Sequence, residues 1–202
     1  MSIWHVEVVT RPGLGRCLVA TSTILAGETI ISEEPALQTS PEGDEQIDAP
    51  TAVLRAYCSA SSDIQQTVIG SLATIEYESS CSTAVKARED AEQIAESHLW
   101  AQGHDVNSLQ LAIMAFRLNG HSFNGGRSAA LFPLLSKAQH SCSPNALYQP
   151  TGIEGRYVAL TTILSGDEVV MNYLGAEATM GHRMRRSLLQ MQKLFLCRCE
   201  RC

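Results

Sequence analysis

The first third of the chain has the short alternating pattern of β-strands rather than the spacing of helices. Apolar and polar residues alternate from Ile3 to Val9, and turn residues at 11–15 separate this segment from a β-rich stretch at Cys17–Ala20. After a second turn at 24–28, residues 29–31 have the composition of another short strand. The chain is therefore predicted to begin with small β-sheets.

The middle third has a helical pattern. Pro, Gly, Ser and acidic residues gather between Thr39 and Pro50, which indicates an exposed linker. Beyond it, apolar residues recur at three- and four-residue spacing in three segments, Ala52–Ile75, Ala84–Trp100 and Leu109–Arg117. These segments predict a helical insert that packs on the sheets.

The last third returns to short elements after the glycine pair at 125–126. Strands are expected at Tyr157–Thr161 and Glu168–Asn172, and Met180–Leu196 has the pattern of an amphipathic, Arg-rich helix. Separate runs of strands and helices are typical of the α+β class. A length of 202 residues suits one domain, or one domain that carries a sizeable insert.

Composition and charge exclude several classes of protein. Hydrophobic residues make up 45% and charged residues 18% of the chain, which argues for a globular protein and against disorder. A net charge of -6 lacks the Lys/Arg footprint of direct nucleic-acid binding. Residues 1–5 do not begin a secretory signal, and no apolar run reaches membrane-spanning length. We therefore expect an intracellular protein, cytoplasmic or nuclear, without membrane contact.

The seven cysteines are expected to be metal ligands or buried thiols, because disulfides are rare in reducing compartments. The C-x-C-x-x-C run at 197–202 suits Zn²⁺, since the short loop directs three sulfurs to one centre about 2.3 Å from each. Cys142 is the candidate for the fourth ligand, and three free thiols are the alternative. Cys58 and Cys81 have no paired neighbour, which favours buried structural thiols.

Several short motifs follow one another in a specific order. They are Gly15-Arg16-Cys17-Leu18-Val19-Ala20, Ile24–Glu34, Gln139-His140-Ser141-Cys142-Ser143-Pro144-Asn145, Gly166-Asp167-Glu168-Val169-Val170-Met171-Asn172-Tyr173, Phe195 and the cysteine run. This order resembles the SET domain of the SET-and-MYND group of lysine methyltransferases, over roughly Arg11–Pro35 and Leu131–Cys202. The resemblance implies a SET fold of small β-sheets with a C-terminal pseudoknot, a helical insert and a post-SET zinc site.

The resemblance also implies an arrangement of the chain. Residues 1–38 would be the N-terminal part of the SET domain, and 39–118 the helical insert. Residues 119–180 would be the C-terminal part with the pseudoknot, and 181–202 a post-SET helix with a zinc-binding tail. The insert lacks the paired cysteines of a MYND module, and we see no C-terminal helical-repeat domain.

The function implied by the resemblance is transfer of a methyl group from S-adenosylmethionine to a lysine of a protein or peptide. His140 would contact the adenine through its backbone and Phe195 would cover it, in a cofactor site that includes Gly15, Arg16, Cys17 and Gln139. Tyr173 would lie beside the methyl-transfer axis and Phe123 would line the lysine channel. The zinc ligands would be Cys142, Cys197, Cys199 and Cys202.

Four positions depart from the family pattern. Cys17 replaces the second glycine of the Gly-x-Gly cofactor loop, and Gln139 replaces the Asn of Asn-His-Ser-Cys. His121 stands where an Asn precedes the Ser-Phe pair, and Lys193 stands where relatives often carry a Tyr in the lysine channel. A protonated Lys193 would disfavour a lysine substrate unless the helix turns it toward solvent.

These departures leave more than one function open. The first is an S-adenosylmethionine-dependent protein lysine methyltransferase, with Tyr173 and Phe123 at the channel. The second is a SET fold repurposed as a cofactor-independent enzyme for a small apolar molecule, for example a cyclase of Diels-Alder type in secondary metabolism. In that enzyme His121, Tyr173 and Lys193 would supply hydrogen bonds in an apolar cavity. A non-catalytic peptide-binding module has no positive feature in its favour.

Overall fold

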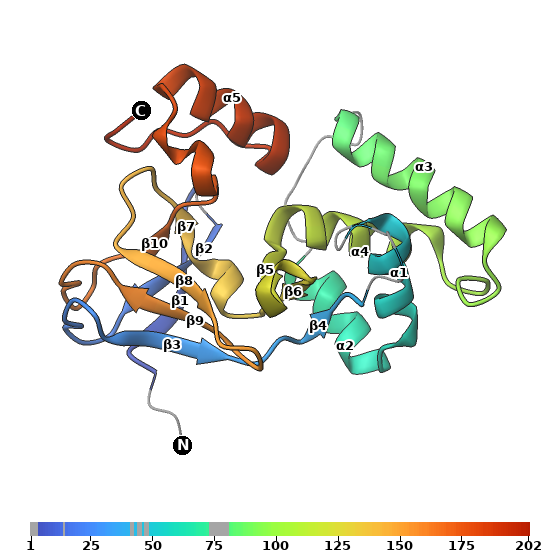
Figure 1. The fold of residues 1–202 in the computed structure, drawn as a ribbon, viewed down its shortest axis with the longest axis horizontal. Coiled ribbons are helices and arrows are strands. Elements are labelled where there is room, and N and C mark those ends of the chain that lie inside the picture. Colours follow the sequence, from blue (N-terminus) through green and yellow to red (C-terminus); the bar gives the residue numbers. More distant parts are fainter. Residues whose placement is uncertain (1–3, 14, 41–42, 44–45, 47–48, 73–80) are drawn as a thin grey trace. The chain divides into compact units, whose positions relative to one another are not determined.

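The computed structural model describes residues 4–13, 15–40, 43, 46, 49–72 and 81–202. It consists of two compact units, which are described separately (Figure 1). Unit 1 combines Met1–Glu34 with Leu134–Cys202, and unit 2 is the continuous segment Pro35–Pro133. Of the predicted segments, Ile3, Leu14, residues 41–42, 44–45 and 47–48 of the linker, and residues 73–75 lie outside the described residues.

Within its described residues, unit 1 contains three small β-sheets (Figure 1). Its strands are β1 (Val6–Arg11), β2 (Gly15–Ala20), β3 (Thr29–Glu33), β7 (Gln139–His140), β8 (Ala146–Pro150), β9 (Gly155–Ala159) and β10 (Val170–Met171). β1 and β2 form an antiparallel hairpin, β9 lies between β3 and β8, and β7 pairs with β10 in parallel. The predicted opening with small sheets is confirmed.

The core of unit 1 comes from the inward faces of these strands. Cys17–Ala20 of β2, Ile30 and Ile31 of β3 and Tyr157 of β9 are all buried. In the β1–β2 turn, Gly13 and Gly15 both have φ +76°, a left-handed conformation that glycine adopts without a side-chain clash. The turn therefore depends on glycine at both positions.

The parallel pair β7–β10 joins the two segments that carry the predicted site motifs. Asn145 makes hydrogen bonds through four groups. Its backbone N–H donates to the Val170 carbonyl of β10 (3.2 Å), and its own carbonyl accepts from the Leu160 N–H after β9 (2.8 Å). Its side-chain Oδ1 accepts from the Val170 N–H (2.8 Å), and its Nδ2 donates to the Glu168 carbonyl (2.8 Å). One side chain thus satisfies the Glu168 carbonyl and the Val170 N–H at the start of β10.

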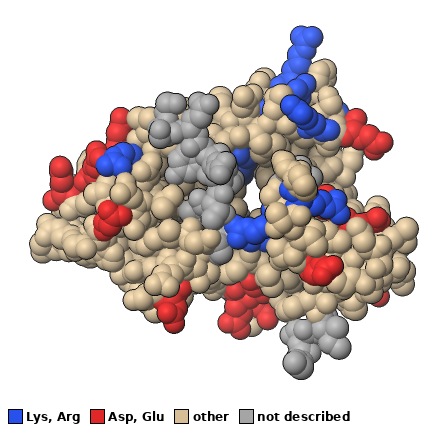
Figure 2. All heavy atoms as spheres, turned by 180° about the vertical axis from the view of Figure 1, so that it is seen from behind, with Lys and Arg blue, Asp and Glu red and all other residues tan. Residues whose placement is uncertain are grey.

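Short helices complete unit 1. They are η3 (Leu135–Lys137), η4 (Gly175–Thr179) and α5 (His182–Lys193). The helix predicted for residues 180–196 is shorter, because Leu194 adopts φ 61°, a left-handed conformation that ends α5 and turns the chain into the cysteine tail. Lys and Arg side chains gather over α5 on the surface seen in Figure 2.

Unit 2 consists of helices and one small sheet. The helices are α1 (Pro50–Ser59), α2 (Ser62–Thr67), the π-helical turn η1 (Val68–Leu72), α3 (Ser82–Ser97), α4 (Val106–Asn119) and the short η2 (Asn124–Gly126). The strands are β4 (Leu37–Gln38), β5 (His121–Phe123) and β6 (Ser128–Leu131), with β6 in the middle. Helices α3 and α4 are joined by an ion pair between Asp90 and Arg117 (2.9 Å). The α+β class is confirmed.

One predicted helix is wrong as a single element. The segment predicted as one helix at 52–75 is divided into α1, α2 and η1 over its described part. The break follows from Ser61, which has extended dihedrals and accepts a hydrogen bond from the Ile64 N–H (3.4 Å), so that it begins a new helix.

The two isolated cysteines of unit 2 are only partly buried, so the prediction of buried structural thiols was wrong in degree. Cys81 lies directly before α3, and its Sγ accepts a hydrogen bond from the Ala84 N–H (3.4 Å). Cys58 lies in α1, where burial raises its pKa to about 11.

None of the helices in the described part of the chain has the length and apolar character needed to cross a bilayer.

Asn145→Ala should lower the free energy of unfolding by about 3 kcal/mol, because it leaves the Val170 N–H and the Glu168 carbonyl without their side-chain partner. Chemical denaturation measures the change. Gln149→Ala on β8 is the control, since the Gln149 side chain accepts one hydrogen bond from Arg156 and should cost less than about 1 kcal/mol. Equal losses in the two variants would contradict a special role for Asn145.

Candidate functional site

Tyr173 follows β10 and lies at the centre of an aromatic cluster in unit 1. Its hydroxyl donates a hydrogen bond to the Ala138 carbonyl (2.6 Å). Its ring lies against His140 (5.2 Å between ring centres) and edge-on to Phe195 (6.2 Å). Burial raises the pKa of Tyr173, and the acidic groups of Cys17 and Glu168 raise it further. The residue is therefore a neutral phenol with a fixed hydroxyl direction.

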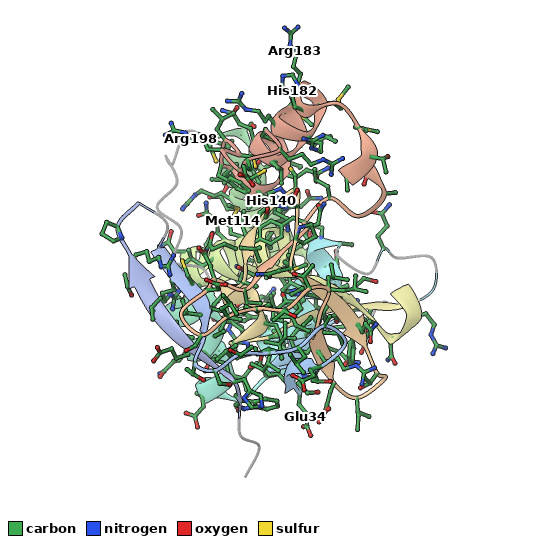
Figure 3. All side chains as sticks on the ribbon, turned by 90° about the vertical axis from the view of Figure 1, so that its left-hand side faces the viewer. Glu34, Met114, His140, His182, Arg183 and Arg198 are labelled. Atoms are coloured by element: carbon green, nitrogen blue, oxygen red, sulfur yellow. The ribbon has the colours of Figure 1, made fainter. Side chains whose placement is uncertain are left out.

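His140 lies between Tyr173 and the cysteines. Its Nδ1 accepts a hydrogen bond from the Tyr173 backbone N–H (3.1 Å), and its Nε2 lies 3.3 Å from Cys142 Sγ. Burial lowers the pKa of His140 to about 4, and the Arg185 charge acts in the same direction. His140 is half-buried, whereas the Arg183 side chain of α5 is exposed and projects outward from its helix (Figure 3).

The predicted cofactor-loop residues also come together in unit 1. The Gln139 amide donates to the Arg16 carbonyl (2.9 Å), so its longer side chain links β7 to β2. Cys17 is completely buried, and its Sγ lies 3.8 Å from the Gly15 carbonyl. Burial raises the pKa of Cys17 to about 11, with Glu168 contributing. Apart from its own chain neighbours, no described residue comes within 4 Å of the position that a Cβ on Gly15 would take, so this side of the loop is open.

Lys193 is the last residue of α5, and its Nζ lies 5.8 Å from the centre of the Tyr173 ring. Its side chain is half-buried. The helix therefore directs the amine at the Tyr173 ring and does not turn it away into solvent.

Two further predicted site residues, His121 and Phe123, lie in β5 of unit 2. Phe123 is buried and packs edge-on against Phe132 (5.8 Å between ring centres). His121 packs against the same Phe132 ring (5.6 Å), and its Nδ1 lies 2.9 Å from the Asn119 carbonyl. The Asn119 contact holds the imidazole at the start of β5.

The four predicted metal ligands converge. The Sγ atoms of Cys142, Cys197, Cys199 and Cys202 all lie within 4.8 Å of one another, packed with Leu174 and Leu189. A tetrahedral zinc ion with Zn–S bonds of about 2.3 Å has sulfurs about 3.8 Å apart, so this group can hold zinc. The segment that contains Cys142 is brought to the tail by the β7–β10 pairing.

Arg185 is a further residue of this site that the sequence analysis did not identify. It is buried in α5, and its Nε donates to Cys142 Sγ (3.2 Å) while its Nη2 donates to Cys202 Sγ (3.4 Å) and the Arg201 carbonyl (3.0 Å). The signal lay in its spacing, because Arg185 stands four residues before the buried Leu189 and therefore on the inner face of the helix.

Comparison with known proteins gives partial matches in sequence. The family model described as "SET domain" matches residues 15–174. The chain is 35% identical over 75 residues to "Protein-lysine N-methyltransferase SMYD4" of Mus musculus, which covers 37% of this chain and 9% of that protein. It is 30% identical over 102 residues to "Histone-lysine N-methyltransferase ASHR1" of Arabidopsis thaliana, with 48% of this chain and 21% of that protein covered. The matches thus span about a fifth of these relatives or less.

Solved structures match the fold over nearly the whole chain. "Structure of Rubisco LSMT bound to AdoMet" aligns with a TM-score of 0.66 at 13% identity, over 98% of this chain and 53% of that one. "Crystal structure of the SET domain of LSMT bound to MeLysine and AdoHcy" aligns with a TM-score of 0.63 at 12% identity, over 98% and 53%. The SET fold implied by the motif order is confirmed, and since the family model covers most of its length, this chain belongs to the SET domain family.

Proposed function

We propose that this protein transfers a methyl group from S-adenosylmethionine to a lysine side chain of a protein, and that a structural zinc ion holds its C-terminal tail. Two curated relatives carry the name lysine methyltransferase, which supports the reaction class. The observation that carries the proposal is the Tyr173 cluster, where the hydroxyl of this half-buried residue is oriented by the Ala138 carbonyl and its ring is flanked by His140 and Phe195.

The residues of unit 1 fit a cofactor of this chemistry. The open side of Gly15 gives a ligand access to the β2 backbone, and the Phe195 and Tyr173 rings offer aromatic faces that attract a cation such as a sulfonium. Cys17 packs completely inside the unit, so its side chain does not fill the open side of Gly15. Gly15, Arg16, Gln139, His140 and Phe195 would hold S-adenosylmethionine, which supplies an electrophilic methyl group when bound.

Tyr173 would orient the substrate amine. Its hydroxyl hydrogen already points to the Ala138 carbonyl, so the oxygen lone pairs remain as acceptors for an amine N–H. Burial keeps the Tyr173 hydroxyl protonated. A phenolate would stabilise the protonated form of the substrate amine, whereas the neutral hydroxyl does not. The neutral amine is the nucleophile that methyl transfer needs.

Lys193 sets a condition on this reaction. A protonated amine 5.8 Å from the Tyr173 ring centre repels the ammonium of an incoming lysine. Burial lowers the pKa of Lys193 to about 8, so a rising pH removes this repulsion. The same amine favours the second candidate, a cofactor-independent enzyme for a small apolar molecule, because an ammonium beside Tyr173 can donate hydrogen bonds to an oxygen of such a substrate.

Tyr173→Phe should slow methyl transfer roughly tenfold to hundredfold, which corresponds to about 1.4–2.8 kcal/mol, and should leave the dissociation constant of S-adenosylmethionine nearly unchanged. The hydroxyl acts on the amine rather than on cofactor binding. Isothermal calorimetry with S-adenosylmethionine and transfer of labelled methyl groups to lysine peptides measure the two quantities.

Tyr148→Phe is the control for this prediction, because Tyr148 lies on β8 against Tyr157 rather than in the Tyr173 cluster. Full activity of Tyr173→Phe would show that the hydroxyl has been assigned the wrong role. If the unaltered protein gives no heat with millimolar S-adenosylmethionine, the cofactor-independent function replaces the methyltransferase.

Lys193→Met should raise the free energy of unfolding at pH 7 by on the order of 2 kcal/mol, and this gain should disappear as the pH rises from about 8 toward 10.5. Below pH 8 the lysine is protonated in both states, and the folded state carries the cost of a buried ammonium. Above 10.5 it is neutral in both states, and that cost is absent. Denaturation at several pH values measures the change.

Gln192→Met is the control for Lys193→Met, because it changes an exposed neighbour that does not titrate. A stability difference between Lys193→Met and the unaltered protein that is constant from pH 7 to 10.5 would contradict the lowered pKa.

The purified protein should contain one zinc per chain, and a chelator should lower its melting temperature by roughly 10 °C through loss of about 4 kcal/mol of binding free energy. Elemental analysis and thermal unfolding measure both effects. Cys142→Ser should lose most of the metal, whereas Cys58→Ser in α1 should retain it. Full zinc occupancy in Cys142→Ser would refute the assignment of the fourth ligand.

A further inference from the structure

We infer that the His140 imidazole couples the cysteine cluster to Tyr173, as a positioning residue that aligns the tyrosine only while Cys142 is held as a metal thiolate. This inference rests on the proposed zinc site. It concerns the imidazole, whereas the family resemblance assigns His140 a cofactor contact through its backbone. Three observations of unit 1 carry it.

The first observation is the hydrogen bond at Nδ1. A backbone N–H can only donate, so the Tyr173 N–H at 3.1 Å requires an unprotonated Nδ1 with a free lone pair. An imidazole without a proton on Nδ1 carries its proton on Nε2. The geometry on the Tyr173 side therefore determines the tautomer, and the ring is a neutral imidazole with an N–H on its opposite edge.

The second observation is what that opposite edge faces. Nε2 lies 3.3 Å from Cys142 Sγ, which is within the range of an N–H···S hydrogen bond. The imidazole thus accepts from Tyr173 with one nitrogen and donates to Cys142 with the other. A ring that makes both contacts cannot turn over without losing both, so each contact fixes the other.

The third observation is that two hydrogen-bond donors lie within reach of Cys142 Sγ. Arg185 Nε donates to the same sulfur (3.2 Å), so two N–H groups converge on it from β7 and α5. A metal-bound thiolate carries negative charge and accepts both bonds well, whereas a neutral thiol is a weak acceptor. Residues that donate to metal ligands typically raise metal affinity and orient the ligands.

As a consequence, a series of contacts would connect the metal site to the Tyr173 hydroxyl. With zinc bound, Cys142 would be a thiolate that accepts the Nε2–H of His140, while His140 Nδ1 accepts the Tyr173 N–H. The ring of the same tyrosine packs on His140, and its hydroxyl is aimed at Ala138. Loss of the metal would weaken the first contact in this series and release the backbone at Tyr173.

Two substitutions separate the two ends of the imidazole. In His140→Gln the side-chain amide nitrogen replaces Nε2 and can donate to Cys142, but nothing replaces the acceptor Nδ1. In His140→Asn the side-chain oxygen replaces Nδ1 and can accept from Tyr173, but nothing replaces the donor Nε2. His182→Gln, at the exposed start of α5, is the control.

The full chain loaded with zinc is used for every measurement. Nitrogen-15 NMR of the imidazoles reports the tautomer of His140, amide hydrogen exchange reports the Tyr173 N–H, and a chromogenic chelator reports zinc release. We expect the Nε2–H tautomer, and we expect zinc removal to speed exchange at Tyr173 roughly tenfold in the unaltered protein. His140→Asn should release zinc about tenfold faster with Tyr173 still protected, and His140→Gln should show the reverse pattern.

In both variants, zinc removal should no longer change exchange at Tyr173. An Nδ1–H tautomer, or exchange at Tyr173 that is equal with and without zinc in the unaltered protein, overturns the coupling even though zinc binding and methyl transfer remain. Absence of zinc from the unaltered protein overturns the coupling together with the zinc proposal. If the variants do not fold, the tautomer and the effect of zinc in the unaltered protein still decide.

Discussion

The positions of Gln139, His140 and Cys142 in unit 1 depend on the hydrogen bonds between residues 139–145 and 168–173. Two strands of two residues each are too short to be stable by themselves, and the Asn145 side chain supplies the partners that a longer sheet would provide. This pairing brings Gln139 to β2, His140 to Tyr173 and Cys142 to the C-terminal tail. A shift of register by one residue would exchange the inner and outer side chains and remove all three contacts at once.

The C-terminal tail is held next to the β7–β10 pair by Arg185 and the four clustered cysteines. Helix α5 buries Arg185 against two thiols and then ends at Lys193, where the left-handed Leu194 reverses the chain toward Cys197. Burial of an arginine is costly unless negative charge surrounds it, and a metal with four thiolates carries such charge. Because His140 contacts both Cys142 and Tyr173, one side chain links the C-terminal cysteine cluster to Tyr173 within unit 1.

The sequence predicted which residues form the sites of unit 1 better than it predicted the contacts between their side chains. The motif order carried the SET fold, and the spacing of Cys197–Cys202 with Cys142 in a threaded segment predicted the sulfur cluster that the structure contains. The break at Ser61 was missed because apolar spacing continued through it, and a cap overrode that pattern locally. Arg185 was missed because the prediction of an amphipathic, Arg-rich helix did not decide which arginine faces inward, although the spacing of Arg185 to Leu189 placed it on the inner face. The tautomer of His140 depends on a contact with the backbone at position 173, which no local pattern encodes.

The four departures from the family pattern are not equivalent. Gln139 reaches the Arg16 carbonyl, Cys17 packs fully inside unit 1, and His121 lies on Phe132 with its ring nitrogen at the Asn119 carbonyl, so each has been accommodated by neighbours within its own unit. Lys193 differs because it changes the charge over the ring of Tyr173, the residue that would orient a substrate. An aromatic ring at that position would attract an ammonium, whereas an amine with a pKa of about 8 repels it in the protonated form and tolerates it in the neutral form. Lys193 is therefore the residue at which the two candidate functions separate: a lysine substrate needs its neutral state, and an apolar substrate with an oxygen acceptor makes use of its charged state.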